Sequence, residues 1–321
     1  MCVAPPTDAA HRVAARQREG AIDVQRRENA GLLFALAGFV LLSLGDSVIK
    51  TIAGAWPGTA VALTRYAIGV AMLGAMLAGS QGRAGFRMVR PRWHVLRGFS
   101  VALATICFFS SLFLMPQAEA TALTFTSPIL TALLSPLLLG ERLNRASFAA
   151  LALGFVGAVI VLRPTFLAVG AAALLPLLSA LGMSLLMIGN RAVAGTQSAL
   201  SMQFFVALLA LPVMAVAAMA GHLSGFPPLH IGLPDWTIVA RCAIVAVTAT
   251  TAHWLLFMAA ERASAARIAP MTYVQLLVAL VVGYAVFGDL PDALSLLGAA
   301  VIVGAGLLLW RSGRTVVATT D

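Results

Sequence analysis

Long apolar segments alternate with short polar breaks along most of this chain. A helix that crosses a bilayer needs about 20 mostly apolar residues, and segments of that kind follow one another from residue 31 to residue 310. The breaks hold glycine, proline and arginine, as in Trp56-Pro57-Gly58 and Arg163-Pro164, which typically end helices. The pattern predicts an all-α polytopic membrane protein with ten transmembrane helices, at 31–53, 58–78, 95–115, 121–139, 146–163, 170–189, 199–219, 236–259, 265–287 and 293–310.

The basic residues are distributed unevenly between the two ends of these helices. If the N-terminus lies in the cytosol, 17 of the 21 lysine and arginine residues fall in cytosolic tails and loops. Cytosolic loops of membrane proteins carry such an excess of positive charge. The bias predicts a multi-pass protein of the inner cell membrane with both termini in the cytoplasm, which requires an even number of helices. Residues 1–29 and 311–321 are then polar cytosolic tails.

Composition also indicates a lipid bilayer as the solvent. Of the 321 residues, 60% are hydrophobic and 10% are charged, whereas a soluble domain carries about 25% charged residues. The formal charge of +9 does not indicate a nucleic-acid partner, because the arginines occur in short runs between apolar segments and not in a patch interleaved with aromatic residues. The expected partners are therefore the lipid bilayer and a small molecule.

The sequence contains a repeat of about half its length. The stretch Thr121–Leu162 is an apolar helix ending in Gly140-Glu141, followed by a glycine-containing helix, and Ala269–Leu309 repeats this order around Gly288-Asp289. Since each half, 30–164 and 165–310, holds five predicted helices, an odd number, the two halves must cross the bilayer in opposite directions. Inverted repeats are typical of alternating-access transporters whose site lies near the midplane, where the halves meet.

Together with the run Ala118-Glu119-Ala120-Thr121-Ala122-Leu123-Thr124-Phe125-Thr126-Ser127-Pro128, these paired helix ends resemble the EamA repeats of the drug/metabolite transporter superfamily. The resemblance covers about residues 30–310 and implies ten spans and transport of a metabolite. Members of that superfamily are known to export amino acids and to move riboflavin, S-adenosylmethionine and nucleotide-like compounds. One difference is that the second half has Tyr273-Val274-Gln275-Leu276 where the first has Thr126-Ser127-Pro128, so helix 265–287 is expected to be less kinked than helix 121–139.

Charged residues inside spans cost about 2.5–3.5 kcal/mol each on insertion scales, so each one needs an explanation. Ser43, Asp46, Ser47 and the chain's single lysine, Lys50, lie on one stripe of the first helix, and Arg65 lies at a similar depth in the second. One interpretation is an Asp46–Arg65 ion pair that fixes the helix hairpin. The other is a cluster of Asp46, Lys50 and Arg65 with net charge +1 that binds an anionic or zwitterionic substrate.

A second set of polar residues lies in the fourth and ninth helices. Thr124 and Ser127 flank the bend expected at Pro128, and Tyr273 and Gln275 are their counterparts in the second half. These side chains either bond to their own helices or line the central cavity and bind substrate. His253 in the eighth helix is a core residue or a proton relay.

Further residues are expected to have structural roles. Glu119 has a structural or an outer gating role, and Glu141 and Asp289 bond to loop backbone. The glycines of the fifth and tenth helices predict close helix packing, within the chain or between two copies in a homodimer.

No catalytic triad, phosphate-binding loop or metal-ligand spacing is present in the sequence, so no enzyme activity, cofactor or metal is expected. These features favour a secondary transporter that moves a small polar metabolite, anionic or zwitterionic, by alternating access. Two alternatives stay open. One is an integral-membrane enzyme acting on a lipid-linked substrate, and the other is a membrane subunit that does not itself transport.

Overall fold

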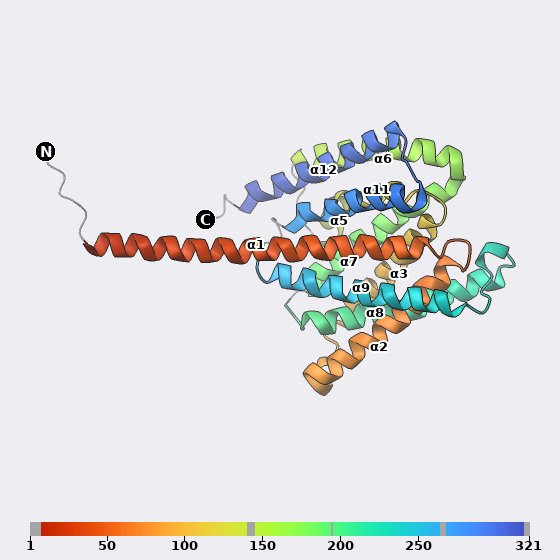
Figure 1. Cartoon of the computed structure of the whole chain (residues 1–321), viewed down its shortest axis with the longest axis horizontal. Coiled ribbons are helices and arrows are strands. Elements are labelled where there is room, and N and C mark those ends of the chain that lie inside the picture. The colour runs from red at the N-terminus through yellow and green to blue at the C-terminus, as the bar shows by residue number, and fades with distance from the viewer. Residues whose placement is uncertain (1–7, 140–144, 194, 264–267, 318–321) are drawn as a thin grey trace.

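The computed structural model describes residues 8–139, 145–193, 195–263 and 268–317, and within these residues every regular element is a helix. This confirms the all-helical class (Figure 1). The elements are α1 (Asp8–Lys50), α2 (Gly58–Gly85), α3 (Pro91–Leu112), α4 (Gln117–Thr124), α5 (Ser127–Leu139), α6 (Arg145–Val169), η1 (Gly170–Leu174), α7 (Leu175–Val193), α8 (Ala199–Leu223), η2 (Pro227–Leu229), α9 (Trp236–Ala260), η3 (Ala269–Tyr273), α11 (Val274–Phe287) and α12 (Ala293–Val317).

Six of the described helices are long and apolar enough to cross a membrane, which makes this a multi-pass membrane protein. They are Arg26–Lys50, Gly58–Gly85, Pro91–Leu112, Phe166–Val193, Ala199–Leu223 and Trp236–Ala259. Three shorter apolar helices lie at Ala152–Arg163, Met271–Phe287 and Ala293–Leu308. Each of these nine lies within or largely overlaps a segment that the hydrophobic pattern predicted. The remaining predicted segment, 121–139, is divided between α4 and α5.

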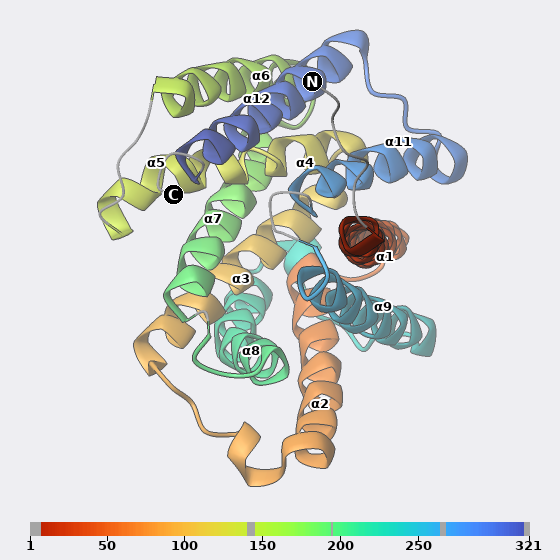
Figure 2. The same cartoon turned by 90° about the vertical axis from the view of Figure 1, so that its left-hand side faces the viewer.

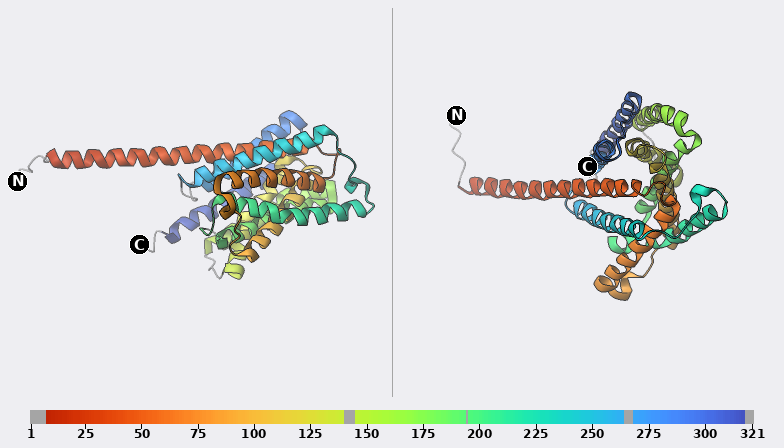
Figure 3. Two further views of the ribbon diagram at one scale, coloured as in Figure 1. Left: turned by 90° about the horizontal axis from the view of Figure 1, so that it is seen from below. Right: turned by 45° about the vertical axis from the view of Figure 1, so that its right-hand side comes forward.

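The first helix is longer than its apolar segment. It runs without interruption over 43 residues from Asp8 to Lys50, so most of the predicted polar tail is helical. In Figure 1 the first half of α1 projects from the body of the protein, and the end of α12 lies on the same side. Figure 3 shows the same arrangement from two further directions. We call this side the terminal end of the bundle and the opposite side, where α1 reaches Lys50, the far end.

Two helices are irregular at matching places. The fourth span is interrupted between α4 and α5 at Phe125 and Thr126, and Pro128 occupies the first turn of α5, where the missing N–H costs no helical hydrogen bond. In the second half, η3 is a 3₁₀-helix that becomes the α-helix α11 at Val274 without a gap. The fourth span, which has proline at its break, is therefore divided into two helices. Its counterpart in the second half changes from a 3₁₀-helix to an α-helix but remains continuous.

The most extensive helix contacts join α6 with α12, α3 with α7, α1 with α9, and α8 with both α2 and α3 (Figure 2). Small residues allow the closest of these contacts. A Cβ atom added at Gly157 of α6 would lie 2.9 Å from the carbonyl oxygen of Gly298 in α12. The glycines of this pair thus pack within one chain, which is one of the two arrangements expected from the sequence.

Candidate functional site

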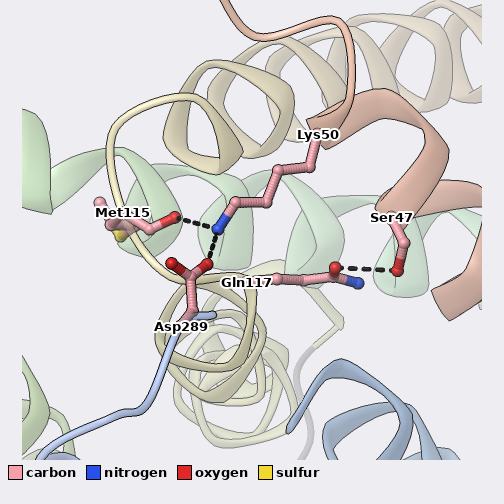
Figure 4. A network of polar contacts seen from close by, with 5 residues as sticks. All are labelled: Ser47, Lys50, Met115, Gln117 and Asp289. Carbon is pink, nitrogen blue, oxygen red and sulfur yellow. Dashed lines mark hydrogen bonds and ion pairs between the residues drawn. The ribbon is translucent and has the colours of Figure 1, made fainter. Parts of the chain in front are cut away.

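A charged contact closes the helix bundle at the far end. Lys50, at the last residue of α1, forms an ion pair with Asp289 in the link between α11 and α12 (Figure 4). Its ammonium also donates to the carbonyl oxygen of Met115, in the link between α3 and α4, at 3.3 Å. A cation at a helix C-terminus also interacts favourably with the helix dipole. Three separate segments of the chain are held together by this one side chain.

A hydrogen-bonded layer lies one turn deeper along α1. The hydroxyl of Ser47 lies 2.9 Å from Oε1 of Gln117, a fully buried residue of α4 (Figure 4). The amide nitrogen of Gln117 donates to the carbonyl oxygen of Ser43 at 3.1 Å. The hydroxyl of Ser43 in turn donates to the backbone oxygen of Gln275 at 3.0 Å. The serine stripe therefore joins α1 to α4 and α11.

Arg65 of α2 lies among aromatic rings within the membrane-spanning region. Its guanidinium carbon is 5.0 Å from the ring centre of Tyr66 and 5.5 Å from that of Phe109. The helix α9, which carries His253, packs against α2 and also against α1, which carries Asp46. The helices that carry Arg65, Asp46 and His253, two from the first half and one from the second, are thus joined through α9.

No ion pair within 4 Å joins Asp46 to Arg65 in the described part of the chain. The hairpin clamp expected from the sequence is therefore not closed in this conformation. His253 donates from Nδ1 to the carbonyl oxygen of Ala249 at 2.6 Å, one turn earlier in the same helix. This bond fixes the ring, and Nε2 remains the nitrogen available for a further partner.

The residues at the two helix breaks are brought together only in part. The hydroxyl of Thr124 donates to the carbonyl oxygen of Ala120 at 2.9 Å, the local bond that was one of its two expected roles. Tyr273 stacks edge-on against Phe125, with ring centres 5.4 Å apart, so the two breaks touch. The side chain of Gln275 donates to the hydroxyl of Thr272 at 3.2 Å. Ser127 begins α5 at the break.

Two charges have partners that the sequence did not predict. Lys50 contacts the loop segments of the far end and forms no ion pair within 4 Å with Asp46 in the described part of the chain. The backbone N–H of Asp289 donates to the carbonyl oxygen of Gly283, and its carboxylate pairs with Lys50. Glu119 accepts a hydrogen bond from Ser295 at 3.1 Å and so links α4 to the start of α12. Glu141 lies outside the described residues.

Sequence reasoning missed a buried polar group near the terminal end. Arg97 lies within α3, and only 4% of it is exposed. It donates to Oδ1 of Asn190 in α7 at 2.7 Å and to Nδ1 of His94 at 2.9 Å. The sequence signal was present, because Arg97 falls inside the predicted third span, where a charge requires a partner.

Comparison with known proteins identifies the family of this chain. Residues 29–163 match the EamA-like transporter family. A riboflavin transporter of Rhizobium johnstonii is 30% identical over 295 residues, which cover 91% of this chain and 94% of that protein. The chain belongs to the EamA-like transporter family. The resemblance inferred from the paired helix ends is thereby confirmed, and the protein is a membrane transporter of small metabolites.

Other similar proteins carry different substrates. An S-adenosylmethionine uptake transporter of Rickettsia prowazekii is 25% identical and covers 88% of this chain and 93% of its own length. The pseudopaline exporter CntI of Pseudomonas aeruginosa is 25% identical and covers 89% of this chain and 97% of its own length. A crystal structure at 22% identity has a TM-score of 0.57 and covers 90% of this chain and 99% of that one, so this EamA-like protein shares a fold with it.

Proposed function

We propose that this protein is a secondary transporter that moves a small polar, anionic or zwitterionic metabolite across the inner membrane by alternating access. Its ten spans would form two inverted halves, with both termini in the cytoplasm. The observation that carries the proposal is the position of Arg65. A cation placed within the membrane, with no carboxylate within 4 Å among the described residues, is a favourable place for a negative group of a substrate.

Two helix pairs support the inverted arrangement. Gly182 and Gly189 of α7 lie 144 residues after Gly38 and Gly45 of α1. A Cβ atom added at Gly38 would lie 3.0 Å from a backbone oxygen of α9, and one added at Gly182 would lie 2.7 Å from a backbone oxygen of α3. When the two halves are exchanged, the contact of α1 with α9 therefore becomes the contact of α7 with α3.

Two arginines follow the same relation. Arg241 of α9 lies 144 residues after Arg97 of α3. Arg97 binds Asn190 near the end of α7, and Arg241 donates to the carbonyl oxygen of Thr51 at the end of α1, at 2.9 Å. Each half thus supplies an arginine to the C-terminal end of the first helix of the other half, where the helix dipole favours a cation.

The contact between α6 and α12 supports the same symmetry. Gly298 and Ala305 lie 144 residues after Gly154 and Val161. A Cβ atom added at Gly154 would lie 3.5 Å from the Cβ of Ala305, and one added at Gly298 would lie 2.6 Å from a methyl group of Val161. Each contact is the image of the other after exchange of the halves, as a two-fold axis in the membrane plane requires.

The substrate site would include Asp46, Arg65 and His253, together with the residues at the helix breaks: Thr124, Ser127, Tyr273 and Gln275. The first three come from α1, α2 and α9, and the Phe125–Tyr273 contact joins the two breaks. In this arrangement Arg65 would bind the negative group, and Asp46 and His253 would adjust the local charge. Lys50 would act elsewhere, at the far end.

Uptake into proteoliposomes tests the substrate class. Because relatives are named for riboflavin and S-adenosylmethionine, the panel pairs neutral riboflavin with its 5′-phosphate and adds zwitterionic S-adenosylmethionine. We expect a charged compound to be transported and Arg65→Gln to abolish its transport, while Arg65→Lys retains part of it because the charge remains. Transport of neutral riboflavin alone, unaffected by Arg65→Gln, would contradict the proposed role of the cation.

A reporter tests the orientation separately. Fused after Arg314, near the end of the chain, it should be active only in the cytoplasm, as should one fused before Asp8. Activity of either reporter outside the cell would contradict the proposed topology, whatever the substrate proves to be.

A further inference from the structure

The Lys50–Asp289 ion pair joins the two proposed halves at one end of the bundle. Lys50 and Met115 belong to the first half, and Asp289 belongs to the second. All three lie at the far end, where α1 finishes, α4 begins and α12 begins (Figure 4). In an alternating-access transporter, a direct contact between halves at one end persists only while that end is closed. The ion pair must therefore break whenever the far end opens.

Other contacts also join the proposed halves at the two ends. Arg241 donates to the carbonyl oxygen of Thr51 at the far end, and Arg97 donates to Oδ1 of Asn190 near the terminal end. The Lys50–Asp289 contact differs from these two because it pairs opposite charges. It can therefore be tested both by removing and by exchanging the charges.

The surroundings of the pair make its rupture costly. The side chain of Lys50 is 12% exposed and that of Asp289 is 27% exposed, so both charges are largely removed from water while they are paired. Lys50 also lies over the ring of Phe287, with its nitrogen 5.0 Å from the ring centre. Separating partly buried charges is unfavourable unless water reaches them. Opening of the far end must therefore hydrate both groups.

We propose that the Lys50–Asp289 ion pair is the closing contact of the gate at the far end and that it holds this end closed in the absence of substrate. This inference rests on the alternating access and topology of the proposed function. It assigns a gating role to two residues that lie outside the proposed substrate site.

Water access beneath the ion pair provides the measurement. Ser47 is one turn below Lys50 and only 7% exposed, so a cysteine at this position is shielded while the gate is closed. We would place Ser47→Cys in the full-length chain and replace the native thiols with Cys2→Ser, Cys107→Ala and Cys242→Ala. Intact cells are then treated with a membrane-impermeant maleimide, and the rate of labelling is followed without any substrate.

Four backgrounds separate the charge interaction from general disruption. Lys50→Met keeps the length of the side chain, and Asp289→Asn keeps its shape, so both remove the ion pair with little change in packing. We expect each to raise the labelling rate by about tenfold, as a shift of the resting equilibrium toward the far-open state would. Exchange of the charges, Lys50→Asp with Asp289→Lys, should restore slow labelling. Arg163→Gln removes an exposed positive charge of α6 and should leave the rate unchanged.

Three results would overturn the inference: equal labelling in all backgrounds, fast labelling of the charge-exchanged protein, or equally fast labelling after Arg163→Gln. The first would mean that the pair does not hold the gate. The others would mean that labelling reports disruption of the fold and not loss of this contact. Because no substrate is added, failure of the metabolite panel does not affect this result, and the reporters test the orientation independently.

Discussion

Three glycines of α12 offer a test in which the same substitution should have three different effects. Gly298 faces α6, and Gly306 faces the ring of Tyr273. An added Cβ at Gly304 would have no atom of the described residues within 4 Å apart from those of its own helix. Each glycine lies within the same helix, so replacement by alanine changes helix propensity in the same direction at all three positions. Differences among the three variants therefore report their surroundings.

The largest effect is expected at Gly298. A Cβ atom there would lie 2.8 Å from the carbonyl oxygen of Gly157 and from the backbone nitrogen of Val161, whereas ordinary contacts are 3.4–4 Å. Backbone atoms cannot rotate away, so α6 and α12 must separate by about 0.6 Å, which already forfeits a substantial part of the dispersion energy of the facing atoms. Overpacking of this kind costs about 1–3 kcal/mol.

The other two glycines provide matched comparisons. Gly304→Ala should leave the thermal stability unchanged or raise it slightly, because nothing obstructs the methyl group. At Gly306 the added atom would lie 1.7 Å from the hydroxyl oxygen of Tyr273, the tip of a side chain that can rotate. Gly306→Ala should therefore displace Tyr273 and lower transport with less loss of stability than Gly298→Ala.

Thermal unfolding of the purified protein in detergent, followed by loss of the monodisperse gel-filtration peak, measures the first two effects. Gly298→Ala should lower the apparent melting temperature by several degrees relative to Gly304→Ala. Equal melting temperatures for these two variants would refute the packing argument. A lower value for Gly304→Ala would show that its face is covered, as by a second copy of the chain.

Further predictions concern individual charges. Asp46→Asn should leave the protein folded, because no close ion pair is lost, and should retain part of the transport activity, whereas Arg65→Gln should abolish transport with the protein still in the membrane; equal activity of both variants would contradict this. Arg97→Leu should reduce the amount of folded protein, and Asn190→Leu should do the same to a smaller extent, as judged by gel filtration, because only one of the two described partners of Arg97 is removed. The backbone N–H of Ser295 donates to Oδ1 of Asp292 at 2.7 Å and holds the pKa of this carboxyl group below its usual value of 3.8. The carboxylate should therefore stabilise the start of α12 above that pH and lose its effect at more acid pH, and Asp292→Ala should show a weaker acid loss of melting temperature than the unchanged protein.

The positions of the helices were predictable from the sequence because the bilayer imposes one length scale on every span. The end of α1 was predicted at residue 53 and lies at Lys50, since glycine at 54 and proline at 57 set the turn only approximately. The helical extension back to Asp8 could not be predicted from hydrophobicity, because its residues are polar and carry no apolar periodicity. Local helix propensity was the only available signal there.

The candidate site was predictable in its residue types and only partly in its contacts. Asp46, Arg65 and His253 were identified because charged and titratable groups are rare in spans. The partner of Lys50 was not identified, because four acidic residues lie near helix ends at the far end of the bundle. They are Glu119, Asp235, Asp289 and Asp292. Choosing among them requires knowledge that α11 packs against α1, which is a property of the folded bundle.

Because α1 is unbroken, a small tilt of its buried part produces a large displacement at its N-terminal end. From Gly45, where α1 packs against α9, to Asp8 the helix spans about 55 Å at 1.5 Å per residue. If the buried part of α1 tilts by about 10° as the ends of the bundle open and close, the start of the helix moves by about 10 Å. A motion too small to resolve beside the ion pair thus becomes, at Asp8, a displacement that paired spin labels or fluorophores can follow in real time.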